Sequence, residues 1–225
     1  MIKPFAEKLR TENAVCIACL GDSVTHGYFA SHDGMHSNTD YEAVYHNRLR
    51  QKINLYFSAK SVNIINAGVG GDSAAQGLAR VESDVLRYAP DLTVVCFGLN
   101  DVNGTLDAYT KNLEDIFAAL RRHGSEVIFM TPNMLNTRVT SPVLADYAAK
   151  TAEYQNSGKM DQFMEAAIKT AQQSGAAVCD CYGKWKQLYR LGVDTDQLLA
   201  NHINHPIRAL HTLFADALFD TIFWG

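Results

Sequence analysis

Five short apolar runs, each followed by a stretch with helical periodicity, are the feature that most constrains the fold of this chain. Most of the runs are rich in Val and Ile and none contains proline, as expected of buried parallel strands. They cover about residues 14–20, 61–66, 92–97, 126–130 and 176–181. This alternation predicts an α/β fold in which helices cover both faces of a parallel sheet.

The chain has 225 residues, enough for one large domain with a sizeable core. We find no repeat, low-complexity stretch or linker, so we expect a single domain over residues 1–225. The formal net charge of −4 leaves no basic surplus to hold a nucleic acid or an anionic membrane. No apolar run approaches the roughly 18 residues that a membrane span needs.

The cysteines and the amino-terminal segment bear on the location of the protein. Five cysteines, an odd number, all lie in apolar runs, and no pair has Cys-x-x-Cys spacing. We interpret them as small buried side chains, which suit a reducing compartment. The first ten residues lack the apolar core of a signal peptide. A cytoplasmic location is therefore expected.

Candidate site residues follow three of the predicted strands, at the edge where open α/β sheets bind ligands. They are Ser23 in Gly21-Asp22-Ser23, Gly71 in a glycine-rich turn, and Asn100 in Gly98-Leu99-Asn100. A serine hydroxyl becomes a good nucleophile once a base takes its proton, and His205 near the end of the chain could do so. Each motif alone is equally typical of a turn that caps a helix, and we interpret the neighbouring aspartates, Asp22, Asp72 and Asp101, as caps.

In this combination the sequence resembles the SGNH or GDSL hydrolases. Gly21-Asp22-Ser23 matches the first block of that family, Asn66 to Asp72 the second, Gly98 to Asp101 the third, and His205-Pro206 the last. The blocks occur in family order and span nearly the whole chain. The resemblance implies a three-layer α/β/α sandwich with a flavodoxin-like, five-stranded parallel sheet.

The resemblance also implies a serine esterase that works through an acyl-serine intermediate. Ser23 would attack the carbonyl, and His205 would accept its proton and later pass one to the leaving group. The backbone N–H groups of Ser23 and Gly71 and the side chain of Asn100 would hold the oxyanion. This chemistry needs no metal and no organic cofactor. Small-molecule esters, with short acyl groups on carbohydrates as one class, are the implied substrates.

One position departs from the family pattern. The family has aspartate three residues before the catalytic histidine, and this chain has His202 there. We hypothesise a Ser23–His205 dyad, with a backbone carbonyl, Asp194, Asp196 or His202 orienting the imidazole. The resulting His-x-x-His is not a zinc signature.

Two further histidines lie in a polar loop after the first motif. His32 and His36 have no carboxylate or cysteine beside them, so we interpret them as loop residues and predict no metal site.

Two alternatives remain open, and the missing aspartate motivates the second of them. One is a thioesterase or lysophospholipase acting on longer acyl chains, and the other is a catalytically weak homologue that only binds its ligand. We expect residues 28–40 and 132–160 to form the walls of the substrate pocket. Their apolar lining candidates are Tyr28, Phe29, Met134, Leu135 and Tyr147. His26, beside the nucleophile, is either a substrate contact or a loop residue.

Two helix starts are also predicted from local signals. Thr39-x-x-Glu42 has the form of a capping box and predicts a helix from there to about Phe57. Pro206 suits the first position of the last helix, which would place His205 at its N-cap. The positive end of that helix would then keep the imidazole neutral.

Overall fold

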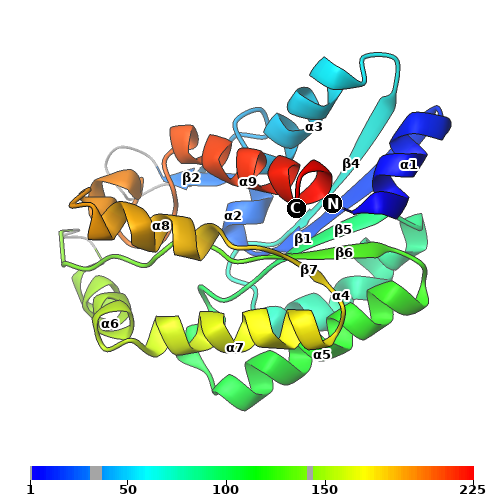
Figure 1. Ribbon diagram of the computed structural model, residues 1–225. Coiled ribbons are helices and arrows are strands. Elements are labelled where there is room, and N and C mark those ends of the chain that lie inside the picture. The colour runs from blue at the N-terminus through cyan, green and yellow to red at the C-terminus, as the bar shows by residue number, and fades with distance from the viewer. Residues whose placement is uncertain (1, 31–36, 141–143) are drawn as a thin grey trace.

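The computed structural model describes residues 2–30, 37–140 and 144–225. Its centre is a parallel sheet of five strands in the order β4-β1-β5-β6-β7 (Figure 1). The strands are β1 (Ala14–Gly21), β4 (Ser61–Gly68), β5 (Leu92–Cys96), β6 (Glu126–Met130) and β7 (Ala177–Cys179). All five fall on the predicted runs, and every residue of the central strand β5 is buried. That burial on both faces explains the continuous apolar run of this strand.

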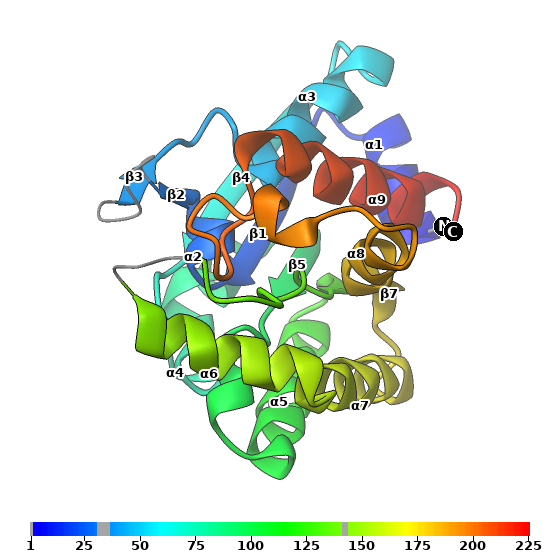
Figure 2. The same ribbon diagram turned by 90° about the vertical axis from the view of Figure 1, so that its left-hand side faces the viewer.

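Helices cover both faces of the sheet, which confirms the predicted three-layer sandwich (Figures 1 and 2). One layer contains α1 (Lys3–Thr11), α3 (Tyr45–Tyr56), α8 (Cys181–Arg190) and α9 (His211–Phe223). The other contains α4 (Ala74–Asp84), α5 (Leu106–Arg122) and α7 (Lys159–Gln173), with α6 (Ala145–Asn156) packed beside α7. A one-turn helix, α2 (Ser23–His26), follows β1 directly.

Helix α5 illustrates how the sequence pattern becomes packing. Thr105 caps its amino end by accepting a hydrogen bond from the N–H of Ala108. Its buried face includes Leu113 and Phe117, four residues apart, as an amphipathic helix requires. The ring of Phe117 meets Phe129 of β6 edge-on, with centroids 5.9 Å apart. Such an aromatic pair adds about 0.5–1.5 kcal/mol to the stabilisation from burial alone.

The predicted start of the helix after Thr39 is wrong. Residues Ser37–Thr39 instead form a short strand, β3, which pairs with β2 (Tyr28–Ala30). The chain then turns where the Asp40 carboxylate accepts the N–H of Ala43 at 3.0 Å. The helix begins only at Tyr45, because Val44 still has an extended backbone.

The predicted start of the last helix at Pro206 is wrong as well. Pro206 lies in an isolated β-bridge with Leu199, and a short 3₁₀ turn, Arg208–Leu210, comes before α9. Helix α9 itself begins at His211. His205 is therefore not at a helix N-cap, and a helix dipole does not account for the neutral state of its imidazole.

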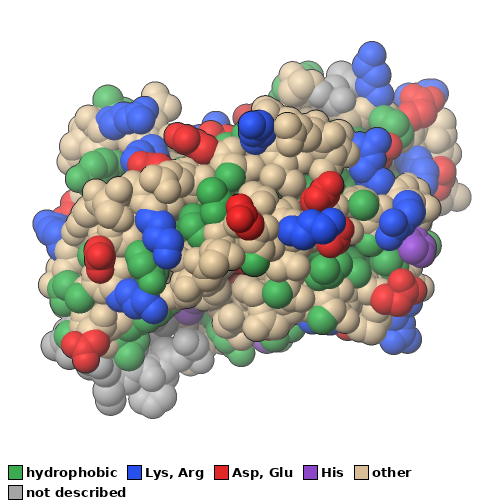
Figure 3. Space-filling view, turned by 90° about the horizontal axis from the view of Figure 1, so that it is seen from below, with side chains coloured by type: hydrophobic (Ala, Val, Ile, Leu, Met, Phe, Trp, Pro, Cys, Tyr) green, Lys and Arg blue, Asp and Glu red, His purple; other side chains and the backbone are tan. Residues whose placement is uncertain are grey.

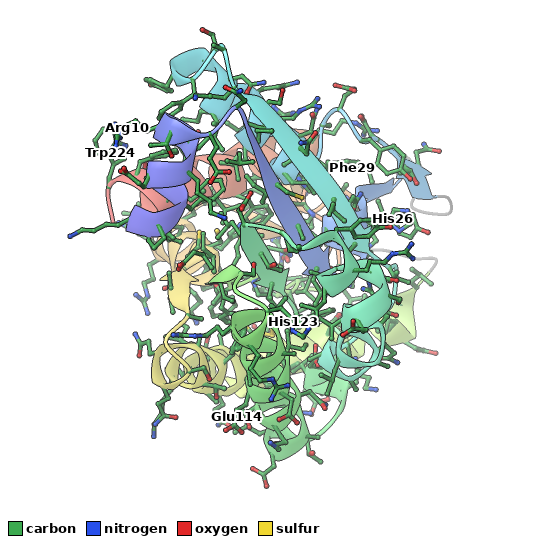
Figure 4. The ribbon with its side chains drawn as sticks, turned by 90° about the vertical axis from the view of Figure 1, so that its right-hand side faces the viewer. Arg10, His26, Phe29, Glu114, His123 and Trp224 are labelled. Carbon is green, nitrogen blue, oxygen red and sulfur yellow. The ribbon has the colours of Figure 1, made fainter. Side chains whose placement is uncertain are left out.

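The two ends of the described chain meet on one side of the molecule. The backbone N–H of Ile2 donates to the carbonyl of Ile222 at 2.9 Å, beside the N and C labels in Figure 1. Figure 4 shows Arg10 and Trp224 there, whereas His26 and Phe29 lie at the opposite side. The strand ends that carry the predicted site are on the side of His26.

The surface carries charges of both signs. On the face seen from below, where α5 and α7 lie, basic and acidic side chains are interspersed (Figure 3). Lys111 and Asp115 of α5 form one such ion pair at 2.7 Å. Among the described residues, no helix combines the length and the apolar character needed to cross a membrane.

Candidate active site

Ser23 lies at the carboxyl end of β1 and opens helix α2. The Asp22 carboxylate caps this turn by accepting the N–H of Val24 at 2.9 Å. Ser23 is only 6% exposed, and its Oγ lies 2.9 Å from Nε2 of His205. This is hydrogen-bond distance, so the neutral imidazole can accept the proton of the hydroxyl. The structure therefore brings together two predicted residues that are 182 positions apart.

Gly71 lies in the turn after β4 with a backbone φ of +85°. A Cβ atom at this position would meet nothing within 4 Å. The glycine is therefore required by its left-handed conformation, not by close approach of another group.

Asn100 follows β5 and is tied to the turn that carries Gly71. Its Nδ2 donates to the carbonyl oxygen of Asp72 at 2.8 Å. The neighbouring Asp101 accepts the N–H of Ala74 at 2.8 Å, and burial raises its pKa to about 6. Two hydrogen bonds thus join the strand ends of β4 and β5, where the oxyanion donors were predicted.

Arg80 of α4 is a supporting residue that the sequence analysis did not single out. Its guanidinium donates to the Asp72 carboxylate at 2.7 Å and to the backbone carbonyls of Ala67 and Gly21 at 2.7 and 3.0 Å. It therefore holds the ends of β4 and β1 together beneath the site. The sequence did not predict this role, because an arginine in a helix with regularly spaced apolar residues is usually exposed to solvent.

His205 sits in a loop, residues 199–206, that approaches α2 from the carboxyl-terminal part of the chain (Figure 2). Burial lowers its pKa to about 4, because the charged form loses its hydration. Its Nδ1 is buried and has no hydrogen-bond partner among the described residues. The imidazole is therefore neutral near pH 7 because of burial.

None of the three side chains proposed to orient His205 hydrogen-bonds to its Nδ1 within the described residues. Both oxygens of Asp194 accept from Nη2 of Arg138 at 2.6 Å. Asp196 is buried and accepts from the backbone and hydroxyl of Thr137, at 2.7 and 2.9 Å, and from Arg138. His202 has a left-handed backbone, with φ of +56°, and its own Nδ1 is unpartnered within the described part of the chain.

A comparison with protein families decides the affiliation. The model of the GDSL-like lipase/acylhydrolase family matches residues 19–213. The chain belongs to this family. The matched range includes Ser23, Gly71, Asn100 and His205.

Two curated relatives match the chain in part. An arylesterase of Vibrio mimicus is 30% identical over 114 residues, covering 48% of this chain and 56% of the relative. An uncharacterised lipoprotein, YqeF, of Bacillus subtilis is 28% identical over 125 residues, covering 51% and 47%. The matched residues thus span about half the length of either relative.

Solved structures show the same fold over nearly the whole chain. The acetylxylan esterase Axe2 of Geobacillus stearothermophilus is 18% identical with a TM-score of 0.72, covering 94% of this chain and 95% of that one. A two-domain esterase active on acetylated mannans is 19% identical with a TM-score of 0.73, covering 98% of this chain and 51% of that one. A lipase/acylhydrolase of Enterococcus faecalis is 22% identical with a TM-score of 0.70, covering 92% and 95%.

The pocket candidates of this GDSL-like protein divide into two groups. Phe29, Met134 and Leu135 are fully buried and belong to the core. Phe29 packs against His211, with ring centroids 4.7 Å apart. Tyr28 and Tyr147 are only half-buried and are available to a ligand.

His26 belongs to helix α2, and its ring stacks on that of Tyr28 with centroids 4.3 Å apart. Burial lowers the pKa of His26. An open hollow of about 500 Å³ lies beside it, between α3 and the edge strand β4. His26 is therefore part of an aromatic wall next to the nucleophile.

Two sequence predictions fall partly or wholly on residues outside the described ranges. His32 and His36 lie there, as do positions 31–36 and 141–143 of the expected pocket walls. Within residues 2–30, 37–140 and 144–225, no three His, Cys, Asp or Glu side chains are grouped so that they could hold a metal ion.

Proposed function

We propose that this protein is a serine esterase that hydrolyses carboxylic esters through an acyl-serine intermediate. The observation that carries the proposal is the 2.9 Å contact between Ser23 Oγ and His205 Nε2 at the carboxyl edge of the sheet. Family membership and the matched arylesterase agree with this chemistry.

In the acylation half, Ser23 Oγ attacks the ester carbonyl while its proton passes to Nε2 of His205. The carbonyl oxygen becomes an oxyanion, which the N–H groups of Ser23 and Gly71 and the amide of Asn100 stabilise. The imidazolium then protonates the departing alcohol. In the second half, water attacks the acyl-serine with His205 as the base, and the carboxylic acid leaves. Every proton taken from a nucleophile is returned to a leaving group, so no cofactor is required.

We propose short acyl groups on carbohydrates as the substrate class. Support comes from the similar folds, which include an acetylxylan esterase and an esterase active on acetylated mannans. The half-buried Tyr28 and Tyr147 would form part of the pocket wall. No observation favours long-chain thioesters or lysophospholipids. A series of chromogenic esters of increasing acyl length tests this choice, and a preference for long chains would contradict it.

Labelling with a fluorophosphonate tests the nucleophile directly. The intact mass of the wild type should increase by one adduct, and that of Ser23→Ala should not change. The absence of an adduct on folded wild-type protein would contradict the esterase proposal and favour a ligand-binding homologue.

We also propose a cytoplasmic location. The five cysteines are free, and four of them are buried. Fractionation of the native host tests this, and recovery in the membrane fraction would favour the kind of location that the name of the Bacillus lipoprotein implies.

A further inference from the structure

The backbone of the loop that carries His205 is held by hydrogen bonds from within the loop. The side-chain oxygen of Asn201 accepts the N–H groups of Ile203, Asn204 and His205, at 3.1, 2.9 and 2.9 Å. The remaining N–H of the turn, that of His202, donates to the carbonyl of Leu199 at 2.9 Å. One side chain thus satisfies three consecutive backbone donors immediately before the imidazole.

The carbonyl groups of the same turn are fixed from outside it. The carbonyl of Asn204 accepts from Nδ2 of the buried Asn133 at 2.9 Å, and that of Ile203 accepts the N–H of Asn136 at 2.9 Å. The carbonyl of His205 accepts the N–H of Ala200 at 2.6 Å. The backbone of His205 is therefore anchored to the loop after β6 and to the strand-like segment before the turn.

The imidazole of His205, in contrast, is held only at one end. Its Nε2 meets Ser23, while its buried Nδ1 has no partner among the described residues. In a triad an acid at Nδ1 would fix the position of the ring. Asp194 and Asp196 are bound to Arg138 and Thr137 instead.

We propose that Asn201 is the positioning residue of the Ser23–His205 dyad and does, through the backbone, what an aspartate would do through Nδ1. This inference rests on the proposed esterase function. With Cα of His205 fixed by the Asn201 oxygen, few rotamers of the side chain remain, and the buried surroundings of the ring select the one that places Nε2 on Ser23. Within the described residues, the hydrogen bonds of the Asn201 side chain go to the turn itself and not to Ser23 or the imidazole, so its effect on the dyad must pass through the backbone of His205.

The conservative variant tests the chemistry that the proposal requires. Asn201→Asp keeps a side-chain oxygen that can accept all three N–H groups, whereas Asn201→Ala removes it. We expect Asn201→Asp to retain kcat within about threefold and Asn201→Ala to lose about 10²-fold, the usual scale of general-base catalysis, with little change in KM. The rate of fluorophosphonate labelling should decrease in parallel, because it reports activation of Ser23.

A double-mutant cycle separates positioning of His205 from a general structural role. In a His205→Ala background the dyad is already lost. Adding Asn201→Ala should therefore lower the residual kcat by no more than about twofold. A full further loss in that background would overturn the proposal. Asn201→Ala with normal kcat in the single variant would overturn it as well.

Circular dichroism and thermal melting check that each variant is folded. If Asn201→Ala does not fold, Asn201→Ser takes its place in the cycle, since a serine hydroxyl makes the same backbone contacts more weakly. The esterase proposal fails separately, if the wild type neither reacts with the fluorophosphonate nor hydrolyses any ester. A labelled, active wild type that is indifferent to Asn201 would refute only the positioning role.

Discussion

Asn100 and Asp72 are joined by a hydrogen bond of 2.8 Å from the side-chain amide of one to the backbone carbonyl of the other. It connects the end of β5 to the turn that carries Gly71, so two of the three predicted oxyanion donors, Gly71 and Asn100, are held together. Only one N–H of the Asn100 amide is used in this bond, and its second N–H remains available to an oxyanion.

Replacing Asn100 with alanine removes both the hydrogen bond to the Asp72 carbonyl and the predicted oxyanion donor. We expect kcat for a chromogenic acetate to decrease about 10²–10³-fold, the usual cost of losing one oxyanion donor, with KM nearly unchanged. Asn103→Ala is the matched control, because Asn103 is exposed, ends the 3₁₀ helix Asp101–Asn103 that follows Asn100, and its side chain donates, among the described residues, only to the backbone carbonyl of Asn100, at 3.1 Å. A similar loss in both variants would mean that the effect comes from disturbing the turn.

Gly71→Ala tests whether the backbone conformation of this turn matters for activity. Alanine at φ of +85° is strained, which destabilises the protein by about 1–2 kcal/mol or shifts the turn. We expect a clear loss of kcat, because a shift would move the Gly71 N–H away from the oxyanion. Gly124→Ala provides the control, since Gly124 has φ of +83° and an equally open surrounding. It should lower the melting temperature by a similar amount and leave kcat unchanged.

The acid limb of the pH–rate profile should lie well below that of an ordinary histidine. Burial lowers the pKa of His205 to about 4, so the neutral, proton-accepting form persists from pH 7 down to about pH 5. We expect kcat/KM to be flat over that range and to decrease below it. Circular dichroism at each pH separates titration of the base from acid unfolding, and a midpoint near 6.5 in folded protein would contradict the prediction.

Stability should decrease over a related pH range. Burial lowers the pKa of His46 and His211 to about 4 and about 3, so in the unfolded chain these groups take up protons that the folded protein excludes. Below pH 6.5 these histidines and His205 therefore take up protons on unfolding, whereas the carboxyls of Asp22 and Asp101, whose pKa values burial raises to about 7 and about 6, release theirs. The histidines outnumber the carboxyls, so the free energy of unfolding should decrease shallowly as the pH falls from about 6 toward 4.5. Urea denaturation at pH 7.5, 6 and 5 measures this. His46→Gln should flatten the dependence, and an unchanged slope would argue against the buried titration.

His202→Asp restores the family pattern three residues before His205. Aspartate tolerates the left-handed backbone at this position, so the loop should accept it. If the carboxylate reaches Nδ1 of His205, it will raise the pKa of the imidazole by about 1–3 units and increase kcat. We expect the acid limb of the pH–rate profile to move upward accordingly. An unchanged profile would show that the loop holds position 202 away from the ring.

The apolar runs predicted the sheet and the strand-end positions of Ser23, Gly71 and Asn100, whereas the meeting of Ser23 with His205 was predicted through the family resemblance, because His205 lies in a loop. A short apolar run predicts a buried strand, because the apolar character of its residues directly indicates burial. The carboxyl ends of parallel strands share one edge, so residues that follow them meet whatever their separation along the chain.

The remaining details depend on contacts that no local pattern contains. The Thr39–Glu42 pair has the form of a helix cap, but pairing of β3 with β2 overrides it. His205 is neutral, as expected, but burial and not a helix end is the cause. Phe29, Met134 and Leu135 were predicted to line the pocket because they are apolar residues of segments 28–40 and 132–160, and all three are fully buried in the fold. Asn201 and Arg80 gave no signal, since their partners are backbone groups brought close only by folding.

The hydrogen bond between Ile2 and Ile222 holds the first and last described elements together, on the side away from His26 of helix α2. Because these two parts of the chain are adjacent, joining them and opening the chain elsewhere changes the connectivity but not the packing of the elements. A circular permutant, with the old ends linked by a short glycine-rich peptide and new ends at the exposed turn around Gly192, would therefore preserve the layers, the strand order and the dyad.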